Sequence, residues 1–208
     1  MKSLTQRLAA AAAILVFAVS FNAHAAIGDA SVDDVTLDGQ PADAFAYQAG
    51  WNPHAGPNGD TSGFGTTFDA YGTGEFELLD RADLNEGFAN TGTLTFTITG
   101  TDGDGGQWTV TNTSALDIIT LDLVFALHAG NQGGAWLFDN QIIMPGETLQ
   151  GDWRIEWTVG AGNTPDYSNV TIFGRDIVTT PIPEPGTYAM LLAGLFVTGA
   201  AMRWKGRA

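Results

Sequence analysis

The chain has 208 residues, of which 44% are hydrophobic and 15% are charged, with 27 glycines and no cysteine. This length accommodates one globular domain of ordinary size together with targeting segments, and it excludes a multidomain protein. The composition is typical of a turn-rich globular chain without long charged helices. The lack of cysteine excludes disulfides, thiolate metal sites and cysteine nucleophiles.

The charge is strongly negative and unevenly distributed. The formal net charge is −15, and all 23 acidic residues lie between Asp29 and Glu184, where the only basic residues are Arg81, Arg154 and Arg175. Such an acidic surface repels phosphate backbones and anionic lipid head groups, and it favours solubility. We therefore expect no nucleic-acid partner.

The N-terminus, residues 1–25, has the three parts of a secretory signal peptide. Two basic residues precede an uncharged stretch over residues 8–21, and Ala23 and Ala25 supply small residues at positions −3 and −1 of a cleavage site. The apolar run is shorter than the ~20 residues that a membrane-spanning helix needs. We expect export across the inner membrane and cleavage by signal peptidase.

Residues 26–180 are predicted to form one β ectodomain. Residues 26–70 have the composition of loop and edge, and residues 51–60 are especially rich in residues that break regular structure. Further along, apolar and polar residues alternate over residues 94–99 and 153–159, as half-buried strands require. The other candidate strands cover residues 75–79, 108–112, 119–127, 136–143 and 170–172.

The candidate strand over residues 119–127 differs from the others because it carries apolar residues on both faces. Val124 and Ala126 lie on its second face, which predicts partial cover on both sides of the sheet. Turns rich in glycine and proline separate the candidate strands. Seven or more short strands at this spacing predict an all-β fold, an antiparallel β-sandwich of jelly-roll-like type.

Candidate metal ligands in this domain are weak. Asp102 and Asp104 resemble the start of a calcium loop, but Gly106 and Thr113 occupy positions that would have to hold acidic ligands. A hairpin turn explains this stretch better, so we expect no cofactor and keep calcium as an alternative. The histidines that follow the signal peptide, His54 and His128, lack metal-ligand spacing.

Candidate binding or catalytic side chains are equally sparse. Trp51 and Trp136 lie in loop-like contexts and are the candidates for stacking on a sugar face, although tryptophan more often fills a core. No serine after the signal peptide lies in a nucleophile elbow. The many carboxylates are better explained as a solvated surface than as a glycosidase pair. We expect no enzymatic activity.

The C-terminal segment, residues 181–208, begins with prolines, continues with an uncharged stretch over residues 186–202 and ends in basic residues. As a helix, the uncharged stretch is about 26 Å long, slightly short of the ~30 Å hydrocarbon core of a bilayer. The basic side chains beyond it can snorkel to the interface and should remain cytoplasmic. We predict a short transmembrane helix that leaves the ectodomain on the far side of the inner membrane.

Three features stand in order in this segment: a Pro-Glu-Pro tripeptide, the apolar stretch and the basic end. This arrangement resembles the PEP-CTERM sorting signal of Gram-negative bacteria. Trp204 and Gly206 depart from the pattern by interrupting the basic run. The matching residues are Pro183, Glu184 and Pro185 in the motif, and Arg203, Lys205 and Arg207 in the basic end.

The resemblance implies handling by exosortase, a membrane protease thought to recognise and cut such tails. It also implies an exopolysaccharide-producing, biofilm- or floc-forming bacterium, and transient membrane anchorage before display at the cell surface or release. We expect an exported structural or adhesive component of the extracellular matrix. The alternatives are a permanent anchor that is never cut, a carbohydrate-binding module and, with less support, a secreted hydrolase.

Overall fold

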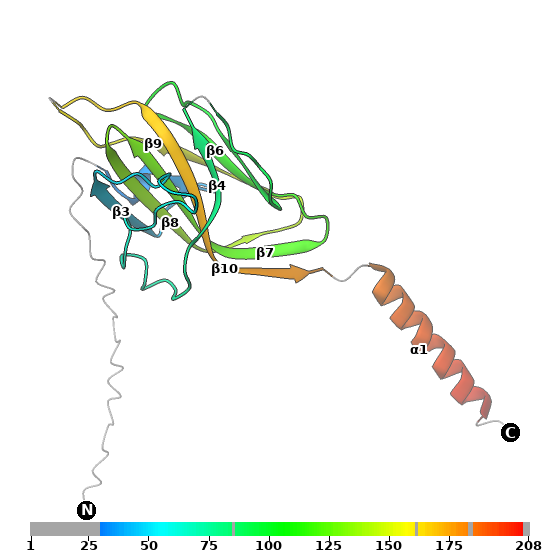
Figure 1. Ribbon diagram of the computed structural model, residues 1–208. Coiled ribbons are helices and arrows are strands. Elements are labelled where there is room, and N and C mark those ends of the chain that lie inside the picture. Colours follow the sequence, from blue (N-terminus) through cyan, green and yellow to red (C-terminus); the bar gives the residue numbers. More distant parts are fainter. Residues whose placement is uncertain (1–29, 85, 161, 183–184, 206–208) are drawn as a thin grey trace, which may run out of the picture.

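The computed structural model describes residues 30–182 and 185–205 apart from residues 85 and 161. The predicted signal peptide lies outside these residues. Regular structure in the described chain is mostly strand, followed by one α-helix (Figure 1). The elements are η1 (Val32–Asp34), β1 (Thr36–Leu37), β2 (Gln40–Pro41), β3 (Ala44–Ala49), β4 (Glu77–Asp83), β5 (Leu94–Ile98), β6 (Gly105–Asn112), β7 (Asp117–Ala129), β8 (Gln132–Ile143), β9 (Thr148–Arg154), β10 (Tyr167–Pro181) and α1 (Pro185–Lys205).

The strands form two main antiparallel sheets and a small ribbon. The larger sheet has the order β3-β8-β7-β10-β4, the smaller has the order β5-β6-β9, and β1 pairs with β2. The two main sheets face each other as layers (Figure 1). The prediction of an all-β, antiparallel, sandwich-like fold is confirmed, while its jelly-roll-like topology stays a prediction.

The main core lies between the two sheets, because alternate residues of each strand point inward. Along β7 the inward residues include Leu123, Phe125 and Leu127, all buried. They meet the inward face of β6, where Trp108 and Phe125 have ring centroids 4.9 Å apart. Burial of such apolar surface is the main driving force for folding.

The outward face of the larger sheet is covered over one half only. Val124 and Ala126 of β7 point outward, yet both are completely buried. Their cover comes from residues 50–76, a long segment without strand or α-helix that we call the covering loop. Its aromatic residues Phe64 and Phe68 pack on that face. The predicted cover of both sides of this strand is therefore confirmed.

The structure corrects two predicted boundaries. A strand is expected over residues 153–159, but β9 runs from Thr148 to Arg154. The residues after Arg154 do not pair with β6 and are not part of the sheet. Alternating burial still continues through Ile155 and Trp157, so the sequence pattern reported burial without a strand ladder. The expected linker over residues 179–183 instead begins as strand, since β10 pairs with β7 as far as Pro181.

The helix α1 stands apart from both sheets (Figure 1). It covers the predicted stretch over residues 186–202 and continues to Lys205. In the described part of the chain, no helix combines the length and the apolar character that crossing a membrane requires.

Candidate functional site

The two tryptophans proposed for sugar stacking are buried. Trp51 belongs to the covering loop and is 2% exposed, packed in the cluster between that loop and the larger sheet, and Trp136 is 0% exposed between the two sheets. Each indole N–H donates to a main-chain carbonyl, Trp51 to Asp60 at 3.1 Å and Trp136 to Ser31 at 2.8 Å. The expectation that these rings are exposed is therefore wrong, because each fills a core position and joins distant segments.

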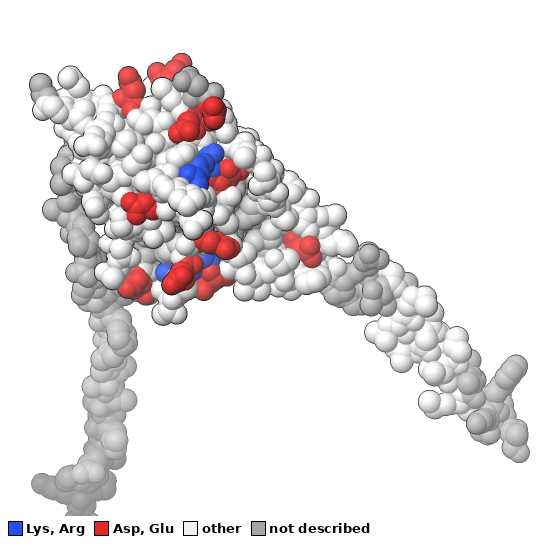
Figure 2. Space-filling view, in the orientation of Figure 1, with Lys and Arg blue, Asp and Glu red and all other residues white. Residues whose placement is uncertain are grey.

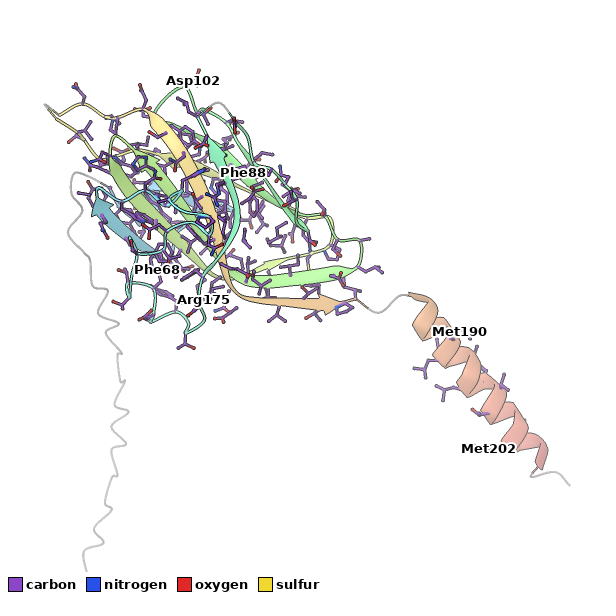
Figure 3. All side chains as sticks on the ribbon, in the orientation of Figure 1. Phe68, Phe88, Asp102, Arg175, Met190 and Met202 are labelled. Carbon is purple, nitrogen blue, oxygen red and sulfur yellow. The ribbon has the colours of Figure 1, made fainter. Side chains whose placement is uncertain are left out.

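The carboxylates proposed for calcium lie in an exposed turn. Asp102 and Asp104 follow β5 and precede β6, as a hairpin requires, and both side chains are exposed. Asp102 lies far from Arg175 and α1 at the other end of the sandwich (Figure 3). Among the residues described, no group of three or more histidine, aspartate or glutamate side chains gathers in a way that could hold a metal ion.

The two histidines have separate structural surroundings. His54 lies in the covering loop with its Nδ1 3.5 Å from a carboxylate oxygen of Asp83. His128 lies near the end of β7, and burial lowers the pKa of its imidazole. Neither histidine belongs to a group of metal ligands within the described chain.

Arg175, which the sequence did not single out as a site residue, makes four side-chain hydrogen bonds. Its Nε and Nη2 donate to one carboxylate oxygen of Asp122 at 2.9 and 2.8 Å, and both side chains are buried. Nη1 donates to the carbonyl of Gly72 at 3.0 Å, and Nη2 to that of Phe68 at 3.4 Å. The guanidinium also lies 4.3 Å from the ring centroid of Phe76. Arg175 therefore attaches the covering loop to β10 and β7, and Figure 3 shows it beside Phe68.

The other two arginines of the domain also serve the fold. Arg81 donates to the carbonyls of His54, Gly56 and Pro57 at 2.8–3.1 Å and holds the start of the covering loop. Arg154 pairs with the buried Asp34 at 3.0 Å. Figure 2 shows carboxylates spread over the visible face of the sandwich with few basic groups between them. The acidic surface inferred from composition is confirmed in this view.

One carboxyl group beside the Arg175 pair has a perturbed pKa. Burial raises the pKa of Asp139, and the neighbouring Asp122 and Asp43 carboxylates raise it further, against a lowering by a hydrogen bond from Asn140. Asp139 follows the covered part of β8, and its main-chain N–H donates to Asp43 at 2.8 Å. These groups stand at the edge of the covering loop, where Asp122 is already paired with Arg175.

A cavity of about 210 Å³ opens between the sheets beside β4 and β5. Its walls are mostly apolar, with Leu79, Leu94, Ile119 and Ile177 among the lining residues. The one carboxylate in its lining, Asp117, accepts a hydrogen bond from the Ser114 hydroxyl at 2.9 Å. The cavity therefore suits an aliphatic group better than a polar substrate.

The strand β10 carries the chain out of the sandwich toward the predicted sorting signal (Figure 1). The last described contact before α1 is the main-chain N–H of Ile182, which donates to the carbonyl of Leu116 at 2.7 Å. Beyond it, α1 exposes apolar side chains at consecutive positions, which lie on all sides of a helix. These residues are Met190, Leu191, Leu192, Leu195, Phe196 and Val197.

The predicted sorting residues are only partly described. Pro185 is the first residue of α1, Lys205 is the last, and Arg203 is exposed near that end. The remaining residues of the predicted tail and cleavage sites lie outside the described residues. They are Ala23, Ala25, Pro183, Glu184 and Arg207.

Comparison with known proteins adds no relative. No protein-family model, curated protein or solved structure matches this chain.

Proposed function

We propose that this protein is exported across the inner membrane of a Gram-negative bacterium, is held there by its C-terminal segment, and reaches the cell surface or the medium after exosortase cuts that segment. The observation that supports this proposal is α1. This helix stands apart from the sandwich (Figure 1), begins at the last residue of the Pro-Glu-Pro tripeptide, exposes apolar side chains from Met190 onward and has Arg203 and Lys205 in its last turn.

The described side chains of α1 are exposed on all sides of the helix, which favours a lipid or protease environment over packing against the sandwich. Met190, Phe196 and Val197 are at least 70% exposed, and large apolar side chains normally avoid water to this extent only when another surface covers them. The helix has 21 residues, about 32 Å at ~1.5 Å per residue. The exposed Arg203 near the end of this helix can reach the interface on its long side chain.

For the sandwich we propose a structural or adhesive role in the extracellular matrix, associated with exopolysaccharide and without catalysis. Its three arginines and the tryptophans described above are engaged in holding strands and the covering loop together. The surface that remains is acidic and soluble. Such a domain fits display outside the cell, where a fold without disulfides depends on its packing.

The test is the intact mass of the protein recovered outside a host that has exosortase, compared with a matched strain that lacks it. The proposal expects a product that has lost both the signal peptide and the residues after the Pro-Glu-Pro motif. Without exosortase, the full tail should remain and the protein should stay with the membrane.

The matched variant replaces Pro183 and Pro185 by alanine, and its control replaces Pro145 by alanine in the exposed turn after β8. The motif variant should accumulate in the membrane with its tail intact, whereas the control should be processed normally. An extracellular product that still contains Trp204, or normal processing of the motif variant, contradicts the proposal.

A further inference from the structure

The half of the larger sheet's outward face that the covering loop leaves bare is apolar. Val178 of β10, Thr120 of β7 and Ile142 of β8 lie in one row across three neighbouring strands. Alternate residues of a strand share a face, so the next row along the sheet brings Ile118 and Thr180 to the same side. No charged side chain lies in these two described rows.

We call this surface the exit patch and define it by its exposed apolar members. Ile142 and Val178 are 59% and 56% exposed, the highest values among the large apolar residues of the sandwich. The patch ends where β10 releases the chain toward α1. Its members are Leu116, Ile142, Met144, Val178 and Ile182.

The exit patch lies next to the start of α1, which indicates that a membrane covers it. Two residues lie between Ile182 and Pro185. The three Cα-to-Cα steps that join them span at most about 11 Å. An α1 inserted in a bilayer therefore holds this end of the sandwich next to the lipid surface. Figure 2 shows uncharged residues over much of the end of the sandwich nearest α1, with a carboxylate among them.

We propose that the exit patch rests on the bilayer while α1 is inserted. This inference depends on the membrane anchorage proposed above and specifies how the anchored ectodomain is oriented. Insertion of aliphatic side chains at the interface gains apolar contact, and the two rows through Val178 and Thr180 carry no charged side chain that head groups would repel. A carboxylate at the margin is that of Glu147, which accepts a hydrogen bond from the main-chain N–H of Met144 at 2.6 Å. The orientation places Ile182 and the start of α1 at Pro185 close to the membrane surface, where a membrane protease would act.

The chain has no cysteine, so single introduced cysteines can each carry one fluorophore. The full-length chain would be labelled at Ile142→Cys, at Gln150→Cys and at Val197→Cys, then reconstituted in zwitterionic phosphatidylcholine vesicles that contain nitroxide lipids. Gln150 is the matched control because it is exposed on β9 of the other sheet. We expect the labels at positions 142 and 197 to lose most of their fluorescence, and the label at position 150 to keep it.

The outcomes separate this inference from the function on which it rests. Loss of fluorescence at position 197 without loss at position 142 overturns the orientation alone. Full fluorescence at position 197 overturns membrane anchorage and the orientation with it. Energy transfer between copies labelled at position 142, rising with protein concentration and independent of vesicles, assigns the patch to a second copy and also overturns the inference.

Discussion

The two halves of one sheet face differ completely in their surroundings. Over the first half, outward residues such as Val124 and Phe173 are fully buried beneath the covering loop. Over the second half, outward residues such as Ile142 and Val178 on the same three strands are more than half exposed. The buried pair of Asp122 and Arg175 lies between the two halves.

This difference shows that the strands alone do not determine which part of the sheet face is exposed to solvent. Strands β7, β8 and β10 run through both halves, with register shifts between Leu121 and Leu123 and between Arg175 and Val178, and each half presents apolar side chains outward. The decisive element is the loop, which the Arg175 guanidinium holds through main-chain carbonyls. The covering loop does not extend past Arg175, so the apolar residues beyond it stay exposed and can contact another surface.

The largest expected effect comes from removing the indole ring by which the covering loop packs on the sheet. Trp51→Ala leaves a cavity and an unpaired Asp60 carbonyl, so the free energy of unfolding should fall by about 3–5 kcal/mol. Denaturant titration of the full-length chain in detergent, followed by circular dichroism, measures this loss. Trp51→Phe is the control and should lose less. A loss below about 1 kcal/mol for Trp51→Ala would mean that the covered half does not depend on its cover.

Breaking the ion pair should have a comparable effect through a different cause. Arg175→Met leaves the Asp122 carboxylate buried without its partner, which typically costs about 3–5 kcal/mol. Adding Asp122→Leu removes the uncompensated charge and should recover part of the loss in the same titration. If the double variant is no more stable than the single one, charge burial is not the source of the effect.

A smaller effect is expected at Asp139, on the edge between the halves. Its pKa is raised in the folded chain, so the folded state holds the proton more tightly and stability falls as pH rises through the raised pKa. Asp139→Asn cannot ionise and should gain up to about 0.5 kcal/mol over the wild type above that range, with no gain below it. Unfolding titrations from acidic to neutral pH measure this, and a difference that is constant with pH would contradict it.

The smallest effect is expected on the bare half. Ile142→Ser should change the free energy of unfolding in detergent by no more than about 0.5 kcal/mol, because the side chain is already exposed. The neighbouring Ile143→Ser is the matched control, because Ile143 is 0% exposed. Its free energy of unfolding should fall by about 2–5 kcal/mol. Equal losses for the two variants would mean that the exit patch is packed within the protein.

Much of the strand framework was predictable, because side-chain alternation is a local property of the backbone. The alternation over residues 94–99 correctly located β5, and the apolar second face of residues 119–127 correctly indicated cover. The same rule failed at Ile155 and Trp157, where alternating burial continues after the strand ladder ends. Burial pattern and hydrogen-bond pairing are separate properties, and the sequence reports only the first.

The candidate binding residues were harder to assign because exposure depends on contacts between distant segments. Trp51 was assigned to a loop correctly, but that loop folds onto a sheet, and a side chain at Gly63 or Gly133 would collide with the indole. Arg175 could have been noticed as a charge directly after an apolar strand segment. Its partner Asp122 stands within another apolar strand, so opposite charges in two such strands are a usable indication of a buried pair.

By itself, the sequence determined the class of fold, the acidic character of the domain and the order of the tail's motif, apolar stretch and basic end. These properties follow from composition and short-range periodicity, which need no knowledge of how distant segments meet. Only the tertiary structure decided that the tryptophans lie inside, that the covering loop protects half of one sheet face, and that the apolar remainder adjoins α1. Those outcomes depend on long-range contacts, whose partners become neighbours only when the chain has folded.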